Sequence, residues 1–207
     1  MVKQERAART RETLIRSAAE VFDREGFTVA ALSTICSLAG VSTGALHFHF
    51  ATKAQLAGAV EAAAQQRLDG ITAVEEQAAP VSSLQLLVNA SHRLIRGLGE
   101  DVVLRAGFEL SGAAAGEPGH DLRLHWQKWV ARTLQRAEGG GELHHTVAPQ
   151  DVVTAVVAAT VGFEVLGARD PVWRSAPTVT RFWELLLPRL AVAPVLVGLM
   201  AEGAPRP

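Results

Sequence analysis

The sequence contains a single cysteine, Cys36, so it cannot form an intramolecular disulfide bond. A lone thiol is typical of proteins of the reducing cytosol. The N-terminal residues are charged and include no apolar segment of the kind found in secretory signal peptides. The most apolar run, residues 185–200, is interrupted by Pro188, Arg189 and Pro194, so it is too short to span a bilayer. We therefore expect a cytoplasmic protein that makes no membrane contact.

Sequence motifs of common enzyme classes are also missing. The chain has no P-loop, no dinucleotide-binding fingerprint and no HExxH motif. Its histidines and acids do not complete a convincing set of metal ligands. We therefore expect neither an enzyme nor a protein that holds a cofactor or a metal ion.

The net charge of −1 conceals an uneven distribution of charge along the chain. Residues 1–53 contain seven Lys/Arg and five Asp/Glu, a net charge of +2, whereas the remaining residues contain 13 and 16, a net charge of −3. A basic N-terminal segment on a nearly neutral protein suggests local contact with a polyanion. We expect the segment from Val2 to Arg11, with Arg6 and Arg9, to be an arm that contacts phosphates. The alternative is a disordered tail.

Residues 32–53, LSTICSLAGVSTGALHFHFATK, predict a short helix, a tight turn and a second short helix. Gly40 suits the left-handed conformation that often ends a helix, and Ser42 or Thr43 can cap the next one. The second helix, residues 44–50, is too short to be stable alone and must be held by its neighbours. This pattern is typical of a helix–turn–helix, whose second helix enters the major groove of DNA. The apolar positions that pack the first helix inward are Leu32, Ile35 and Leu38.

The outward side of this second helix is the strongest candidate for DNA binding. We expect Leu46 and Phe50 to point inward, and Gly44 to let the backbone approach the groove. A buried helical hairpin, the alternative, would leave two histidines and a threonine without a role. The next helix begins at Thr52 and Lys53, and a helix N-terminus with a lysine attracts phosphate. The candidate DNA contacts are Arg6, Arg9, Ser33, Ser42, Thr43, Gly44, Ala45, His47, His49 and Lys53.

The whole chain predicts an all-α protein with about nine helices, because no alternating strand pattern occurs. We expect a DNA-binding domain over residues 1–53 and a ligand-binding and dimerisation domain over residues 54–207. The expected helices are about residues 10–25, 32–39, 44–50, 52–76, 82–98, 101–111, 121–137, 149–167 and 176–190.

The helix near residues 152–166 is apolar on nearly every side, so it must be covered on every side. One side can face the protein's own core and the other a second subunit, and the last long helix offers another apolar face. We expect a two-fold homodimer. The candidate interface residues are Val157, Val161, Phe182, Trp183 and Leu186.

The segment from Gly40 to Lys53 resembles the TetR-type transcriptional regulators. GALHFHF and the opening VKQERAARTRETLIRSAAEVFDREGF are similar to the γ-butyrolactone-receptor branch of actinomycetes, which includes pseudo-receptors for other small molecules. The resemblance implies a repressor of secondary-metabolism genes that binds pseudo-palindromic operator DNA as a dimer, through a four-helix bundle. It also implies release by a γ-butyrolactone, or by an antibiotic or its intermediate.

Two positions depart from this branch, which commonly has lysine at position 43 and tyrosine at position 47. Here they are Thr43 and His47. The loss of lysine removes one candidate contact to guanine, so the operator sequence is expected to differ. A small-molecule-binding helical protein with a degenerate DNA-binding head is the alternative function.

Three residues are candidates for contact with the small molecule. Trp126 is implied by the resemblance, because the branch has a tryptophan here that closes on its ligand; the alternative is a core aromatic. Thr160 interrupts an apolar helix, and its hydroxyl bonds either a ligand or the carbonyl four residues back. Gln65 is a weaker candidate on the helix that connects the two domains.

Overall fold

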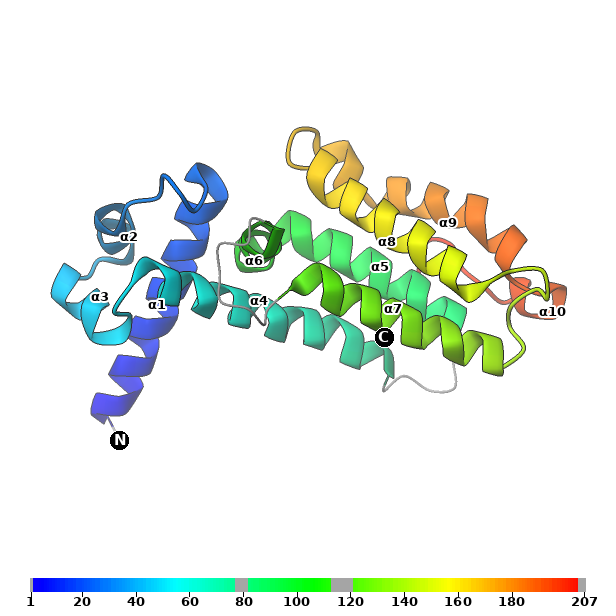
Figure 1. The fold of residues 1–207 in the computed structure, drawn as a ribbon, viewed down its shortest axis with the longest axis horizontal. Helices are drawn as coiled ribbons and strands as arrows, with labels where there is room; N and C mark the ends of the chain where they lie inside the picture. Colours follow the sequence, from blue (N-terminus) through cyan, green and yellow to red (C-terminus); the bar gives the residue numbers. More distant parts are fainter. Residues whose placement is uncertain (1, 77–81, 113–120, 205–207) are drawn as a thin grey trace. The chain divides into compact units, whose positions relative to one another are not determined.

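Ten α-helices and one 3₁₀ helix make up the computed structural model, which describes residues 2–76, 82–112 and 121–204 (Figure 1). The described residues contain no strand, only an isolated bridge between Leu143 and Ala191. The all-α prediction is confirmed; the nine expected helices correspond to α1–α9, and the short η1 and α10 were not expected. In chain order the elements are α1 (Val2–Glu25), α2 (Leu32–Ala39), α3 (Thr43–His49), α4 (Lys53–Glu76), α5 (Ser83–Glu100), α6 (Val102–Gly112), α7 (Leu122–Gly139), α8 (Pro149–Leu166), η1 (Pro171–Arg174), α9 (Ala176–Leu190) and α10 (Ala193–Leu196).

The chain divides into two compact units. Unit 1 comprises Met1–Arg67 and Asp101–Leu122, and unit 2 comprises Leu68–Glu100 and Arg123–Pro207. Unit 1 therefore contains the first part of α4 and the whole of α6 in addition to α1–α3. This division by packing does not coincide with the functional boundary expected after residue 53, which stays a prediction.

The core of unit 1 holds α2 and α3 in place. Both helices have eight residues or fewer, a length that is marginal for an isolated helix. Burying one large apolar side chain contributes about 1.5–3 kcal/mol relative to leaving it exposed, so the shared core stabilises them. Its buried members include Leu14, Val21, Phe22, Ile35, Leu46, Phe50, Leu56 and Val60.

Helix α1 begins at Val2, so the expectation of a separate arm followed by a helix over about residues 10–25 is wrong. Thr10 Oγ1 donates to the carbonyl of Arg6 at 3.0 Å, a bond within the helix. Residues 2–11 contain neither glycine nor proline and are rich in alanine and long polar side chains. Such residues have high helix propensity, which lets the helix continue towards the N-terminus.

In unit 2, a side chain far along the chain caps the N-terminus of α5. The Glu142 carboxylate accepts hydrogen bonds from the backbone N–H of Ser83 at 2.7 Å and of Leu84 at 2.9 Å, and from Ser82 Oγ at 2.8 Å. A carboxylate is favourable here because it meets free N–H groups and the positive end of the helix dipole. This contact ties the loop after α7 to α5.

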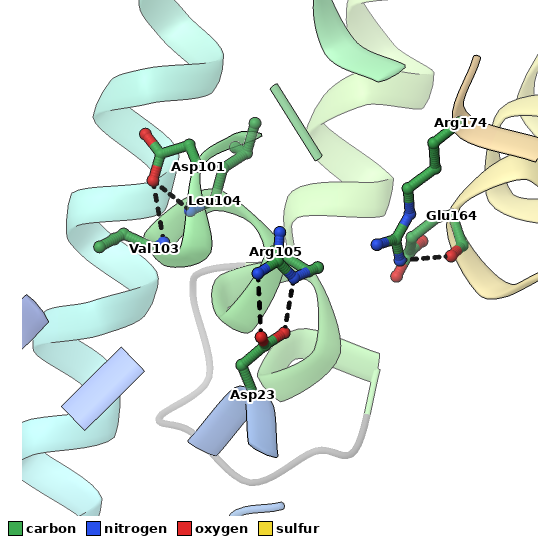
Figure 2. Close-up of polar contacts among 7 residues, drawn as sticks. All are labelled: Asp23, Asp101, Val103, Leu104, Arg105, Glu164 and Arg174. Carbon is green, nitrogen blue, oxygen red and sulfur yellow. Dashed lines mark hydrogen bonds and ion pairs between the residues drawn. The ribbon is translucent and has the colours of Figure 1, made fainter. Parts of the chain in front are cut away.

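Two polar contacts join α7 to α8. Trp126 Nε1 donates to Thr160 Oγ1 at 3.0 Å, and Arg123 pairs with Glu164, with Nη2 2.6 Å from Oε1. Arg174 of η1 donates to the Glu164 carbonyl at 2.7 Å (Figure 2). Helix α8 is long and apolar enough to cross a membrane by length and composition alone, a test that core helices also pass. Its buried polar side chains, Thr160 and Glu164, are bonded within unit 2, as in a core helix.

Candidate DNA-binding head and effector site

The turn between α2 and α3 has the geometry of a helix–turn–helix. Gly40 has a φ of 65°, and the Val41 N–H donates to the Cys36 carbonyl at 3.1 Å, which closes the end of α2. Ser42 is the N-cap of α3, and its Oγ accepts from the Ala45 N–H at 3.2 Å. Residues 40–44 also read Gly-x-Ser-x-Gly, but the hydrolase motif requires a strand before the serine, and here a helix precedes it.

Helix α3 presents a clear outward side. Leu46 and Phe50 are buried, as predicted, while Thr43, Gly44 and His47 are exposed. A Cβ added at Gly44 would meet only Ser42 Oγ, at 3.9 Å, so packing inside the protein does not require this glycine. Ala45 and His49 are half-buried at the edges of this side.

Phe48 was missed from the sequence and is the most exposed large side chain of α3, at 80%. Its ring stacks edge-on against His49, with centroids 5.1 Å apart. A helical-wheel count would have found it, because Phe48 lies about 200° around the helix from the buried Leu46. An exposed phenylalanine in such a position offers apolar contact to thymine methyl groups.

Of the candidate phosphate contacts, Arg6, Arg9 and Ser33 are exposed, but Lys53 is already bonded inside the protein. Lys53 Nζ donates to the carbonyls of Thr28 at 3.2 Å and Ala30 at 2.9 Å. It also lies 4.8 Å from the centroid of the Phe27 ring, a cation–π contact. The ammonium group of Lys53 therefore holds the loop between α1 and α2. That Lys53 also binds phosphate stays a prediction.

The start of α4 is capped as predicted. Thr52 Oγ1 accepts from the Gln55 N–H at 3.1 Å, and Gln55 Oε1 accepts from the Ala51 N–H at 2.9 Å. This reciprocal arrangement resembles a capping box and stabilises the first turn of α4. It fixes the chain directly after α3, and so limits movement of α3 relative to α4.

The candidate effector residues Trp126 and Thr160 are brought together in unit 2, both buried. Thr160 Oγ1 accepts from Trp126 and lies 2.9 Å from the Val156 carbonyl, so the expected bond to the preceding turn is also present. The Trp126 ring stacks on Trp129, with centroids 5.2 Å apart and an 18° angle between planes. Trp129 Nε1 is buried without an acceptor among the described residues. A buried donor of this kind is suited to an acceptor on a ligand.

Gln65 belongs to the other compact unit, and the described cavity of unit 2 does not include the tryptophan pair. Gln65 is half-buried on the part of α4 that belongs to unit 1. A cavity of about 610 Å³ in unit 2 is lined by α5 and the C-terminal residues, and neither Trp126 nor Thr160 is part of its wall. Burial lowers the pKa of His92 in this wall, and outweighs the upward effect of its hydrogen bond with the Ala201 carbonyl.

The outer sides of α8 and α9 carry four of the five predicted interface residues, and the fifth is buried. Val157, Val161, Phe182 and Leu186 are half-buried and lie on accessible sides of the two helices. Trp183 is 0% exposed, so it belongs to the core of unit 2 and cannot contact a partner. Leu185, which was not predicted, is 72% exposed on α9.

Comparison with known proteins decides the family. Residues 14–60 match the model of the bacterial regulatory proteins of the tetR family. The chain is 32% identical to the A-factor receptor protein of Streptomyces griseus over 98% of this chain and 71% of the relative. The chain belongs to the TetR family.

Solved structures of TetR-family members share the fold over nearly the full length. A γ-butyrolactone receptor described as ArpA-like has a TM-score of 0.81 and 28% identity, covering 93% of this chain and 94% of the other. CprB from Streptomyces coelicolor, in complex with its biological operator sequence, has a TM-score of 0.78 and 28% identity over the same shares. The resemblance seen in the first residues of this TetR-family chain therefore extends to the whole of it.

Proposed function

We propose that this TetR-family chain is a dimeric cytoplasmic repressor that binds pseudo-palindromic operator DNA and is released by a small signalling molecule. The outward side of α3, with Thr43, His47 and Phe48 exposed beside a capped turn, is the observation that carries DNA binding. The Gly40 C-cap of α2, the Ser42 N-cap of α3 and the buried core of both helices argue against a degenerate head. The operator complex of the relative CprB supports the same function here.

The effector site is proposed at the stacked pair of Trp126 and Trp129. Two indole rings give a large flat surface, and the Trp129 N–H provides a donor for one ligand acceptor. A mostly apolar ligand with few polar groups suits such a site. A γ-butyrolactone has this character, and the relatives named A-factor receptor and γ-butyrolactone receptor support that class. An antibiotic or its intermediate is the second candidate, favoured by Thr43 and His47, which depart from the receptor branch.

The dimer interface is proposed on the outer sides of α8 and α9. Val157, Val161 and Leu185 present apolar surface there, which a partner's equivalent residues would cover by two-fold symmetry. Two heads held in this way can enter successive major grooves, about 34 Å apart. The regulated genes are proposed to be those of secondary metabolism, as in the branch that the sequence resembles.

The proposal is tested by incubating the purified protein with its own upstream DNA and with a pool of genomic fragments, and separating bound DNA on a gel. We expect fragments to be captured by the wild type, and Phe48→Ala and His47→Ala to bind them more weakly while remaining folded. Ser37→Ala, which changes an exposed residue of α2, is the control. Failure of the wild type to capture any fragment would refute the repressor function.

The effector is tested by adding A-factor, the ligand after which the Streptomyces griseus receptor is named, to the complex of the protein with a captured fragment. Release by A-factor supports a lactone receptor, and Trp126→Ala should bind DNA normally but resist release. A complex that A-factor leaves intact excludes this ligand and directs the same assay to antibiotics and their intermediates.

A further inference from the structure

Helix α6 belongs to the same compact unit as the DNA-binding helices, although it lies far from them in the sequence. The chain enters unit 1 at Asp101 and leaves it after Leu122, so α6 is joined on both sides to residues of unit 2. Only Asp101 separates the end of α5 at Glu100 from the start of α6 at Val102, so a movement of the end of α5 reaches α6 through the backbone. The contacts of α6 inside unit 1 decide what such a movement would do to the head.

Helices α1 and α6 pack against each other, and their contact includes a bidentate ion pair. Arg105 Nε lies 2.7 Å from Asp23 Oδ1, and Arg105 Nη2 lies 3.0 Å from Asp23 Oδ2 (Figure 2). Both side chains are 23% exposed, so water screens the pair only in part. Parallel N–H···O bonds from a planar guanidinium fix orientation as well as distance. The hydrogen bond with Asp23 also raises the pKa of Arg105, consistent with a strong interaction.

Helix α6 is also seated closely against α4. A Cβ added at Gly107 would collide with Ala64 Cβ, so the two backbones approach more closely than any other residue allows. Asp101 Oδ1 caps α6 by accepting from the N–H groups of Val103 at 2.9 Å and Leu104 at 3.2 Å (Figure 2). The other Asp101 oxygen, Oδ2, lies 2.5 Å from Arg67 Nε on α4.

The residue that Arg105 holds is close to the start of the helix–turn–helix. Asp23 is in the last turn of α1, and Gly26, with a φ of 76°, turns the chain directly after it. Phe22 packs against Phe27 in this turn, with ring centroids 5.7 Å apart. The position of the end of α1 therefore sets where the loop to α2 begins.

We propose that Arg105 is a positioning residue for DNA binding, whose pair with Asp23 makes α6 a structural part of the head and fixes the orientation in which α3 meets the groove. The proposal rests on the proposed function and adds a residue that touches no DNA. Loss of the pair leaves α3 folded and the packing of α1 on α6 in place, but removes the bidentate contact that fixes the end of α1. In a dimer, a head that is held less firmly tolerates half-sites at more than one spacing.

The test compares binding to the captured genomic fragment with binding to the same fragment carrying one extra base pair between its half-sites. The wild type is expected to bind the natural fragment more tightly than the fragment with the extra base pair. Arg105→Gln and Asp23→Asn should each bind the natural fragment about tenfold more weakly, and the ratio of the two affinities should fall towards one. The double variant should be no weaker than either single variant, since both remove the same pair. Arg105→Lys keeps the charge without the bidentate geometry, so its affinity for the natural fragment should lie between those of the wild type and Arg105→Gln.

Arg24→Gln is the matched control, because it removes a neighbouring exposed arginine whose partner is Glu25. For Arg24→Gln, the ratio of the affinities for the two fragments should be the same as for the wild type. The slope of log affinity against log salt should be unchanged in Arg105→Gln, because the residue neutralises no phosphate. Circular dichroism checks that each variant is folded at the assay temperature.

Three results would overturn the inference: an unchanged affinity in Arg105→Gln, an equal loss of affinity for both spacings, or a reduced salt slope. A wild type that ignores spacing would overturn it as well. If the proposed function itself is wrong, the wild type will bind no fragment at all, which differs from each of these results.

Discussion

At the scale of single residues, the basic side chains of the head have two different roles that the sequence does not separate. Arg6 and Arg9 are exposed along α1 and available to phosphate. Lys53 instead donates to two backbone carbonyls between α1 and α2. The two roles predict different responses to substitution, since phosphate contact contributes to salt-dependent binding and a loop contact to folding.

Lys53→Met should reduce the free energy of unfolding by about 1–2 kcal/mol, because a charged donor to two carbonyls is lost. The slope of log operator affinity against log salt should stay as in the wild type. Arg9→Gln should do the reverse, lowering the slope by about one with little change in stability. Denaturant titration and gel shifts at several salt concentrations measure both quantities. A lower salt slope in Lys53→Met, with stability unchanged, would indicate that Lys53 contacts phosphate.

His92 makes stability depend on pH. Burial puts its pKa in the folded protein below the ordinary value of 6.5. The unfolded chain therefore takes up the proton first as pH falls, so the contribution of His92 is complete above pH 6.5 and declines below it, towards the folded pKa. We expect the wild-type Tm to fall more than that of His92→Gln between about pH 7.5 and about pH 5.5. Parallel Tm curves for the two proteins over this range would contradict the assignment.

At the scale of helices, α6 is the element whose packing is most sensitive to a small change. Gly107 lies so close to Ala64 that α6 and α4 have no space for a further methyl group between them. Elsewhere on α4, Gly58 has no heavy atom within 4 Å of an added Cβ. The same substitution should therefore have opposite effects at these two glycines.

Gly107→Ala should lower the free energy of unfolding by about 1–3 kcal/mol through overpacking. It should also weaken operator binding, because α6 moves away from α4 and pulls on Asp23. Gly58→Ala, the matched control, should raise stability by about 0.5–1 kcal/mol as a helix propensity effect. Chemical denaturation of both variants provides the comparison. Equal stability changes at the two glycines would show that the close approach of α6 to α4 is unimportant.

The order of the helices could be predicted from local patterns, but contacts between distant residues could not. Apolar spacing and caps placed α2 and α3, and the buried Leu46 and Phe50 confirmed which side faces inward. The start of α1 was misplaced because a threonine that can cap a helix can equally bond inside one. The pair of Arg105 and Asp23 joins residues 82 positions apart, and no periodicity of the sequence indicates such a contact.

At the scale of the whole molecule, the proposed operator binding depends on a dimer that brings two heads onto one operator. The apolar outer sides of α8 and α9 supply the proposed interface. Sequence patterns identified these helices but did not separate the inner from the outer side of α9, because large apolar residues occur on both sides. Trp183 is consequently in the core, and the exposed Leu185 was missed.

Leu185→Glu should convert the dimer into a folded monomer, because it buries an unpaired charge in the interface. Operator affinity should fall by about 100-fold, as the second head no longer binds from the same molecule. Val197→Glu is the control, since Val197 is 91% exposed and lies outside α8 and α9. Analytical ultracentrifugation gives the oligomeric state. A Leu185→Glu protein that remains a dimer would require another interface.

The central claim is that operator DNA and effector favour different conformations of one molecule. Calorimetric titration of A-factor into the free protein and into the protein saturated with its captured operator tests this most directly. We predict that operator DNA weakens A-factor binding by the same factor by which A-factor weakens operator binding, since coupling between two sites is reciprocal. Equal affinity of A-factor for the free and the DNA-bound protein would show that the two ligands do not favour different conformations.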